Sequence, residues 1–296
     1  ADANYDGIPL VCFTGQVATS VIGNDAFQEV DIVGITRTIS KYSTTIRKRE
    51  DLGRAIKEAF YIARTGKPGP VIVDLPSNIV SEIGPAEYPE TVNIRGYKPS
   101  TGVHIRQIKK ALEMLKNAKK PLFLIGDGVN ISHANEEFEK LVNITKVPVI
   151  TTIMGKGAIP TKHPLFIGNV GMHGSYASNK AVNECDVLFS IGTRFNDRVT
   201  GRIAEFAPNA KIIHIDIDSA SISRNIVVNI PIVADAKAAI NELIPLAQEL
   251  YTKKWVNQIK AWDKEYPVTA PSSVEGRISP QAIFENLNKA FTEGIF

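Results

Sequence analysis

The segment spanning residues 187–198 has the residue types that a nucleotide pyrophosphate site needs. A short apolar run ends at Gly192, and two arginines and an aspartate follow within the next six residues. Glycine lets the backbone approach a phosphate closely, and arginine offers forked donors that match phosphate oxygens. The pattern predicts a phosphate-binding loop at the end of a buried strand, formed by Gly192, Arg194, Asp197 and Arg198.

A further acidic group follows along the chain. The apolar strand expected at residues 211–217 reaches Asp216 near its end. An acidic residue about 20 residues beyond the glycines binds the ribose hydroxyls in dinucleotide-binding folds. The alternative interpretation of both segments is an ordinary strand, turn and helix cap, and the local sequence leaves it open.

Three more loops rich in glycine belong to the same block of the chain. They are residues 126–129, 152–157 and 171–174. A glycine after a parallel strand is common turn chemistry, so each loop by itself is weak evidence for a ligand. Because ligands of such sheets bind beyond the carboxyl ends of the strands, the loops and the arginine segment together predict one shared site.

Side chains in these loops offer contacts for a flat ring. Met154 and Met172 could form an adaptable apolar wall, although most methionines fill protein cores. His173 could donate a hydrogen bond to a ligand, or it could be a helix cap or turn contact. Both interpretations stay open for these three residues.

Strands of continuous Val, Ile and Leu alternate with helices through most of the chain. Such alternation is typical of α/β folds in which a parallel sheet is covered on both faces, so we expect doubly wound parallel sheets. The expected strands are residues 8–14, 71–75, 122–125, 147–151, 187–191 and 211–217. The expected helices are residues 50–64, 104–117, 135–144, 176–184, 237–250 and 280–291.

Two segments rich in proline, glycine and serine divide the chain. The first residue is Ala1 rather than Met, and the last expected helix has no core of its own, so we expect a piece of a longer protein. The expected organisation is a partial domain over residues 1–80, a linker over 81–102, a central domain over 103–265, a linker over 266–277 and the first helix of a further domain over 278–296.

Composition argues against several function classes. The 296 residues carry a net charge of +3, with 44% hydrophobic and 22% charged residues, which is ordinary for a globular protein. The basic run Arg47–Arg49 is followed by two acidic residues, which favours a solvated face over a nucleic-acid surface. No apolar run reaches the ~18 residues that span a membrane. Cys12 and Cys185 lack disulfide or zinc spacing, which favours a reducing, cytoplasmic compartment.

Common catalytic motifs are absent from the sequence. Residues 126–128 (Gly-Asp-Gly) resemble the start of the magnesium–diphosphate motif of thiamine-dependent enzymes, but residues 149–154 offer no amide or carboxylate where that motif has asparagines. We therefore interpret residues 126–128 as a turn and predict no metal site. The chain also has no G-x-S-x-G elbow, no P-loop and no cysteine with an evident base.

Whole motifs of the chain resemble the catalytic subunits of acetohydroxyacid (acetolactate) synthases. The resemblance runs from end to end, and its most specific part is the block that begins at Arg194, because other thiamine-diphosphate enzymes share the fold but not that block. The segments that carry the resemblance are Gly15–Val17, Ile22–Glu29, Gly66–Val71, Gly171–Gly174, Arg194–Gly201 and His214–Asp218.

The resemblance implies three α/β domains, of which this chain would hold the C-terminal part of the pyrimidine-binding domain and the central FAD-binding domain. It implies an enzyme that uses thiamine diphosphate and Mg²⁺ to decarboxylate pyruvate. The enzyme would join the product to a second pyruvate or to 2-oxobutyrate, which starts valine, leucine and isoleucine biosynthesis. FAD is required in the family although the overall reaction is not a redox one. A homodimer or homotetramer and a small regulatory subunit are also implied.

Carried over by position, the resemblance implies FAD contacts in both parts of the chain. Phe27 and Gln28 would lie near the substrate channel, and no catalytic residue is expected in this chain. Arg54, Asp235 and Ala236 follow from the resemblance alone, since a surface arginine and a helix cap would be their ordinary interpretation. The FAD-binding residues so implied are Arg54, Gly126, Gly128, Thr152, Ile153, Val170, Gly171, Met172, His173, Gly192, Thr193, Arg194, Phe195, Asn196, Asp197, Arg198, Asp216, Ile217, Asp235 and Ala236.

Departures from the family pattern limit the expected activity. The glutamate that activates thiamine would precede Ala1, and the metal motif would follow Phe296. Losing a carboxylate proton relay typically costs ~10²–10⁴-fold in rate. We therefore expect the isolated chain to bind FAD weakly or not at all and to make no acetolactate. Asp127 replaces the usual glycine and is expected to point away from phosphate, Asn196 stands where aspartate is frequent, and Ala18 stands where proline is frequent.

Two alternatives come from other function classes. An NAD-dependent deacylase would share the fold of the central domain but would carry a structural zinc site, and the two cysteines lie far apart without a Cys-x-x-Cys pair. A non-catalytic nucleotide-binding or assembly module would have the same fold and no chemistry.

Overall fold

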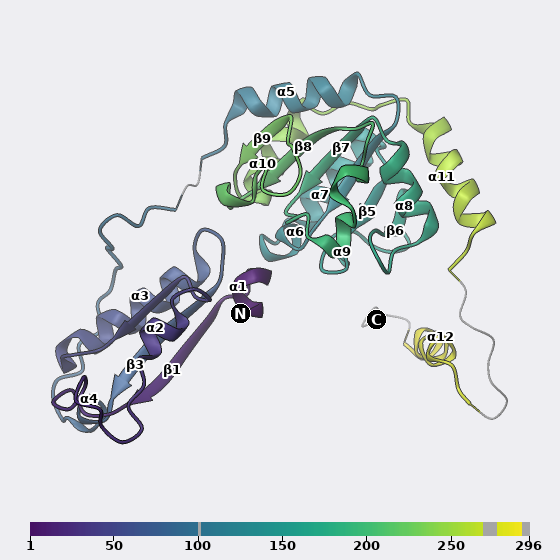
Figure 1. Cartoon of the computed structure of the whole chain (residues 1–296). Helices are drawn as coiled ribbons and strands as arrows, with labels where there is room; N and C mark the ends of the chain where they lie inside the picture. The colour runs from purple at the N-terminus through teal and green to yellow at the C-terminus, as the bar shows by residue number, and fades with distance from the viewer. Residues whose placement is uncertain (100–101, 269–276, 292–296) are drawn as a thin grey trace. The chain divides into compact units, whose positions relative to one another are not determined.

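The computed structural model describes residues 1–99, 102–268 and 277–291 (Figure 1). They form two compact units. The first is Ala1–Gly102 with Ile217–Ser219, and the second is Val103–Asp216 with Ala220–Phe296. The α/β class with parallel sheets that the sequence predicted is confirmed in both units.

The first unit is built on a small parallel sheet with the strand order β1-β3-β2. Helix α3 buries its alanine-rich face and Ile62 against Val71 and Val73 of the central strand. The strands are β1 (Leu10–Gln16), β2 (Tyr42–Thr45) and β3 (Pro70–Pro76). The helices are α1 (Asp2–Asp6), α2 (Ile32–Thr36), η1 (Arg49–Asp51), α3 (Leu52–Arg64) and α4 (Ser77–Ser81).

Residues 82–99, which the sequence predicted as linker, have no helix or strand but lie against the first unit. The Arg49 guanidinium donates to the carbonyl oxygen of Pro85 at 2.8 Å. The Tyr97 hydroxyl donates to the carbonyl oxygen of Thr65 at 2.9 Å. A Cβ on Gly53 of α3 would stand 1.9 Å from the carbonyl oxygen of Glu87. This segment is therefore part of the packing of the unit.

The second unit contains a six-stranded parallel sheet with the order β6-β5-β4-β7-β8-β9. Successive strands extend the sheet outward from β4 in one direction and then outward from β7 in the other. The order reverses between β4 and β7, and that reversal is where doubly wound sheets bind ligands. The strands are β4 (Pro121–Ile125), β5 (Val149–Thr151), β6 (Phe166–Asn169), β7 (Val187–Ile191), β8 (Lys211–Asp216) and β9 (Ile230–Val233).

Helices cover both faces of this sheet (Figure 1). Side chains alternate along β4, so that Phe123 packs with α5, α7 and α10 on one face, whereas Leu124 packs with α8 and α11 on the other. The helices of this unit are α5 (Ile105–Lys116), α6 (Gly128–Ile131), α7 (Asn135–Thr145), α8 (Tyr176–Glu184), α9 (Asp197–Thr200), η2 (Ile203–Glu205), α10 (Ala236–Leu243), η4 (Ile244–Leu246), α11 (Lys253–Glu265) and α12 (Pro280–Ala290). The short helix η3 (Ser219–Ser221) contains residues assigned to both units.

Several predicted elements are confirmed, and one helix is wrong in its extent. The bounds of α8 and β7 match the prediction, and Ser279 caps α12 by accepting from the backbone N–H of Ala282. The helix expected at residues 237–250 instead ends at Leu243, because Pro245 lacks the backbone donor that a longer helix needs. Strands β2, β6 and β9 and helix α11 were not predicted.

Most of the linker expected at residues 266–277, and the end of the segment 278–296, lie outside the described residues. In the part of the chain that the structure covers, no helix combines the length and the apolar character that crossing a bilayer requires.

Candidate functional site

The loops that follow β4 and β7 meet through their backbones at the point where the strand order reverses. The N–H of Gly126 donates to the carbonyl oxygen of Ile191 at 2.9 Å. The N–H of Gly128 donates to the carbonyl oxygen of Gly192 at 3.3 Å. A Cβ on Gly128 would stand 2.6 Å from Cα of Gly192, whose φ of +65° is in the left-handed region. Only glycines can pack this closely.

The loop that follows β5 joins the same place. The N–H of Thr152 donates to the carbonyl oxygen of Ile125 at the end of β4, at 2.9 Å. Ile153 and Met154 are exposed, with 69% and 47% of their surface accessible. Of the two methionines that the sequence suggested as an apolar wall, Met154 is thus exposed beside the glycine loops, and its contact with a flat ring stays a prediction.

Two asparagines hold that loop in place. The Asn130 amide donates to the carbonyl oxygens of Met154 and Lys156, at 3.1 and 3.3 Å. Asn135 donates to the side-chain oxygen of Asn130 at 2.9 Å and to the carbonyl oxygen of Gly157 at 3.0 Å. The loops after β4 and β5 are thus linked by side chains as well as by backbone.

The arginine loop after β7 has an unusual backbone. Phe195 is buried at a φ of +50°, in the left-handed region that few non-glycine residues adopt. Asn196 caps helix α9, because its side chain accepts from the N–H of Val199 at 3.2 Å. The Arg198 side chain is 68% exposed, and its Nε lies 3.9 Å from a carboxylate oxygen of Asp197. The charged end of the loop therefore faces solvent, and its apolar residue is buried.

Residues 171–174 are attached to the arginine loop. The N–H of Met172 donates to the carbonyl oxygen of Arg198 at 2.9 Å, and a Cβ on Gly171 would stand 2.3 Å from that same oxygen. The Asn179 side chain donates to the carbonyl oxygen of Gly171 and accepts from its N–H. Met172 and His173 are exposed, whereas Val170 before them is buried.

The end of β8 adds two polar side chains. His214 is fully buried, and its Nε2 lies 2.9 Å from the carbonyl oxygen of Thr193. The Asp216 carboxylate is almost buried and lies 3.6 Å from the same Nε2. Beyond β9, Asp235 caps α10 by accepting from the N–H of Ala238 at 3.0 Å, and Ala236 is buried. The cap is the ordinary role that the sequence suggested for Asp235.

The remaining predicted residues belong to the first unit. Arg54 is exposed on α3, where it pairs with Asp51 at 2.9 Å and with Glu58 at 3.0 Å. The hydrogen bond that the guanidinium donates to Asp51, followed by the one that it donates to Glu58, raises the pKa of Arg54. Ile217 directly follows β8 and groups with the first unit. Both remain predictions as ligand contacts.

Phe27 and Gln28 lie in a loop that borders a cavity of about 530 Å³ in the first unit. Phe27 is 88% exposed, and Gln28 has a φ of +65°. The Gln16 amide donates to the carbonyl oxygen of Val30 at 2.7 Å and to the carboxylate of fully buried Asp74 at 3.2 Å. The end of β1 therefore fixes the far end of the loop that carries Phe27.

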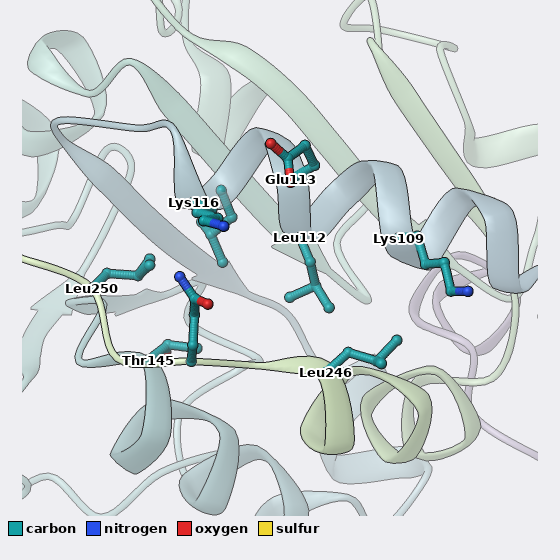
Figure 2. Close-up of a pocket in the computed structure, with 9 residues that line it drawn as sticks. Lys109, Leu112, Glu113, Lys116, Thr145, Leu246 and Leu250 are labelled. Atoms are coloured by element: carbon teal, nitrogen blue, oxygen red, sulfur yellow. The ribbon is translucent and has the colours of Figure 1, made fainter.

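Figure 2 shows a second cavity, of about 300 Å³, in the other unit. Leu112 of α5 and Leu246 of η4 face it, with Lys109 and Lys116 at its rim. It lies where α5 and α7 end, before the first residues of β4 and β5, whereas the glycine loops follow the last residues of those strands. None of the residues predicted to bind a ligand lines it, so it is separate from the candidate site.

Taken together, the loops after β4, β5 and β7 and residues 171–174 are joined to one another beyond the last residues of the strands. The glycine backbones after β4 and β7 pack directly against each other, Arg194 and Arg198 follow in the second of these loops, and Asp216 ends the neighbouring strand. Among the described residues, no group of three or more His, Cys, Asp or Glu side chains could hold a metal ion.

Several residues that hold the site were not singled out from the sequence, among them Asn135 and Asn179. Further examples are His214, Asn130 and Asn225, whose side chains bind backbone carbonyl oxygens of the loops. Asn225 donates to the carbonyl oxygen of Phe195 at 2.9 Å. Each acts on a residue of another segment, so no local pattern indicated them.

Comparison with known proteins agrees with this architecture. Residues 108–243 match the family described as "Thiamine pyrophosphate enzyme, central domain". The chain is 46% identical, over 99% of its length and 50% of the relative's, to a probable acetolactate synthase large subunit of Methanocaldococcus jannaschii. It is 40% identical, over 97% of its length, to the isozyme 3 large subunit of acetolactate synthase of Escherichia coli, covering 51% of that protein. The chain thus spans about half the length of the curated relatives it matches.

Proposed function

We propose that this chain, which belongs to the thiamine pyrophosphate enzymes and is homologous along its length to acetolactate synthase large subunits, is the part of such a subunit that binds FAD. The homology supports membership of the family, and the geometry of the second unit supports FAD as the ligand.

The observation that carries the proposal is the contact between the glycine loops after β4 and β7. It lies at the reversal of strand order, where a dinucleotide crosses a doubly wound sheet. Arg194 and Arg198 follow at once, and guanidinium groups match pyrophosphate oxygens better than any other side chain. Any larger residue at Gly126, Gly128 or Gly192 would push the two loops apart, because its Cβ would meet backbone atoms of the facing loop.

Other residues of the site would position the remaining parts of FAD. The Asp216 carboxylate would accept from ribose hydroxyls. Ile153 and Met172 are exposed and would pack against the flat ring system. When bound, FAD would supply a rigid planar ring and a dianionic pyrophosphate. These residues would orient both without transferring a proton.

The complete subunit would carry out the reaction of its relatives. It would use thiamine diphosphate and Mg²⁺ to decarboxylate pyruvate and would transfer the two-carbon product to pyruvate or 2-oxobutyrate, in branched-chain amino-acid biosynthesis. We propose a homodimer or homotetramer with a small regulatory subunit, in the cytoplasm. A deacylase and a non-catalytic module find no support in the comparisons.

The test is a titration of the purified chain with FAD, followed by flavin absorbance and fluorescence and by the melting temperature. We expect weak binding that raises the melting temperature at high FAD concentration. The proposal for this site would be refuted if neither this chain nor a version extended to the length of its relatives retains or binds FAD.

A further inference from the structure

His214 lies within β8, and its imidazole contacts the arginine loop. Its Nε2 is 2.9 Å from the carbonyl oxygen of Thr193, and its ring meets that of Phe195 with 5.0 Å between centroids. Thr193 and Phe195 are the two chain neighbours of Arg194. One side chain of the central sheet therefore contacts the loop on both sides of its first arginine.

The contacts decide which ring nitrogen carries the proton. A carbonyl oxygen can only accept, so Nε2 of His214 must be the donor. The carboxylate oxygen of Asp216, at 3.6 Å from Nε2, favours the same assignment. Among the described residues Nδ1 has no hydrogen-bond partner, although it is fully buried. A buried polar atom without a partner is costly, so a residue that carries one is expected to have a role that an apolar side chain could not fill.

That role is apparent in the backbone of the loop. Gly192 and Phe195 both have positive φ, at +65° and +50°, and a phenylalanine in this region persists only when its surroundings hold it there. The holding contacts come from outside the loop. Phe206 packs edge-on against Phe195 at 5.9 Å, Asn225 binds its carbonyl oxygen, and His214 binds the carbonyl oxygen of Thr193.

We propose that His214 is a positioning residue which, as the tautomer protonated on Nε2, holds Thr193 and Phe195 so that Arg194 is presented to the phosphates of the bound dinucleotide. The ligand part of this inference rests on the proposed FAD site. The positioning part concerns the loop alone and can be tested separately.

The first experiment needs no substitution. A long-range ¹H–¹⁵N spectrum of the ¹⁵N-labelled chain distinguishes protonated from unprotonated imidazole nitrogens, and the His214 signals are assigned by their loss in His214→Gln. We expect Nδ1 to be the unprotonated nitrogen. A proton on Nδ1 would overturn the proposal.

The second experiment compares His214→Leu, which removes the donor, with His214→Gln, which retains an N–H at the end of its side chain. His163→Leu is the matched control, because this half-buried histidine lies before β6 and, among the described residues, its ring bonds Asn143 and the N–H of Leu165 in its own loop. We expect FAD affinity to fall about tenfold in His214→Leu, the effect of one lost buried hydrogen bond, and distinctly less in His214→Gln. His163→Leu should bind as the unchanged chain does.

Equal affinity of the unchanged chain and His214→Leu would overturn the proposal. If the unchanged chain binds no FAD, the proposed function is what fails at this length. In that case the Nε–H signal of Arg194, assigned by its loss in Arg194→Lys, tests the positioning of the loop without the ligand. A shift of that signal in His214→Leu but not in His163→Leu supports positioning, and an unshifted signal rejects it.

Discussion

Gly126 and Gly192 are in such close backbone contact that a Cβ on Gly126 would stand 2.1 Å from the carbonyl oxygen of Gly192. The contact joins the end of β4 to the end of β7, at the reversal of the strand order. No substitution at Gly126 can keep this geometry, because the obstructing atom is backbone and cannot rotate away.

Gly126→Ala should therefore separate the two loops. We expect a loss of about 1–3 kcal/mol of stability, as for other overpacked sites, together with weaker FAD binding. Thermal denaturation and an FAD titration measure the two effects. Gly102→Ala is the control, because a Cβ there meets no atom within 4 Å. Equal melting temperatures for the two variants would contradict the packing described here.

Arg198→Ala should weaken FAD binding without lowering stability. The side chain is 68% exposed, and its contacts among the described residues are a long ion pair with Asp197 and a 4.0 Å contact with the sulfur of Met172, so the fold loses little when it is removed. A charged hydrogen bond to phosphate contributes about 1.5–3 kcal/mol, which corresponds to a tenfold loss of affinity or more. The salt dependence of binding should also become shallower. Arg202→Ala, an exposed arginine paired with Glu205, should change neither quantity. Similar affinities for the two variants would remove Arg198 from the site.

Asn130→Ala should loosen the loop after β5. The substitution frees the carbonyl oxygens of Met154 and Lys156 and removes the acceptor for Asn135. Amide hydrogen exchange in residues 152–157 should accelerate, because the free energy of opening the loop should fall by about 1–3 kcal/mol, the cost of hydrogen-bonding groups left without partners. Asn117→Ala removes an exposed amide at the end of α5 and should leave that exchange unchanged. Unaltered exchange in Asn130→Ala would mean that the backbone contacts suffice.

The loop at residues 17–31 should open in acid. The Glu29 carboxylate accepts from the backbone N–H groups of Gly23 and Ala26, and these bonds lower its pKa below the ordinary 4.5. A carboxyl group with a lowered pKa stabilises the folded loop fully above about pH 4.5 and loses that effect as the pH falls through the lowered pKa. Amide exchange of Gly23 against pH measures this. In Glu29→Gln the acid-induced change should disappear, and its persistence would place the cause elsewhere.

Only one of the two cysteines should react in the folded protein. Burial, with a smaller effect of the nearby Asp186 carboxylate, raises the pKa of the Cys185 thiol to about 12, whereas Cys12 is partly accessible. Because the thiolate is the reactive form, a thiol reagent at about pH 8 should label Cys12 and leave Cys185 unmodified until the protein unfolds. Rapid labelling of Cys185 in the native state would show that its burial is transient.

Helices and strands with a strong local sequence pattern, such as β7 and α8, were predicted with the correct bounds. The run Val187–Ile191 is apolar except for the buried Ser190, and its bounds were right, as were those of α8, which Ser175 caps by accepting from the N–H of Ser178. Edge strands were missed because they have weaker signals. Strand β9 contains Pro231 and alternates buried with exposed residues, as an edge strand can, and β6 is short and contains Gly168 at a φ of +149°.

For the candidate site, the sequence indicated which loops carry glycine, arginine and acidic residues, because those types are read directly and each loop follows an evident strand. The resemblance supplied Arg54 and Asp235, whose surroundings here are an ion-pair cluster and a helix cap. Neither source gave a role to Asn130 or to His214, although the resemblance covers His214–Asp218, since an asparagine or histidine in isolation has many ordinary roles.

The sequence by itself determined the alternation of strands and helices, the apolar character of each strand and the composition of each loop, because these depend on residues adjacent in the chain. The tertiary structure alone decided the order β6-β5-β4-β7-β8-β9, and that order brings Gly126 beside Gly192. The tertiary structure also places Nε2 of His214 within hydrogen-bonding distance of the carbonyl oxygen of Thr193. Such contacts join residues far apart in the chain, and they form only when a whole sheet is assembled, so no local pattern encodes them.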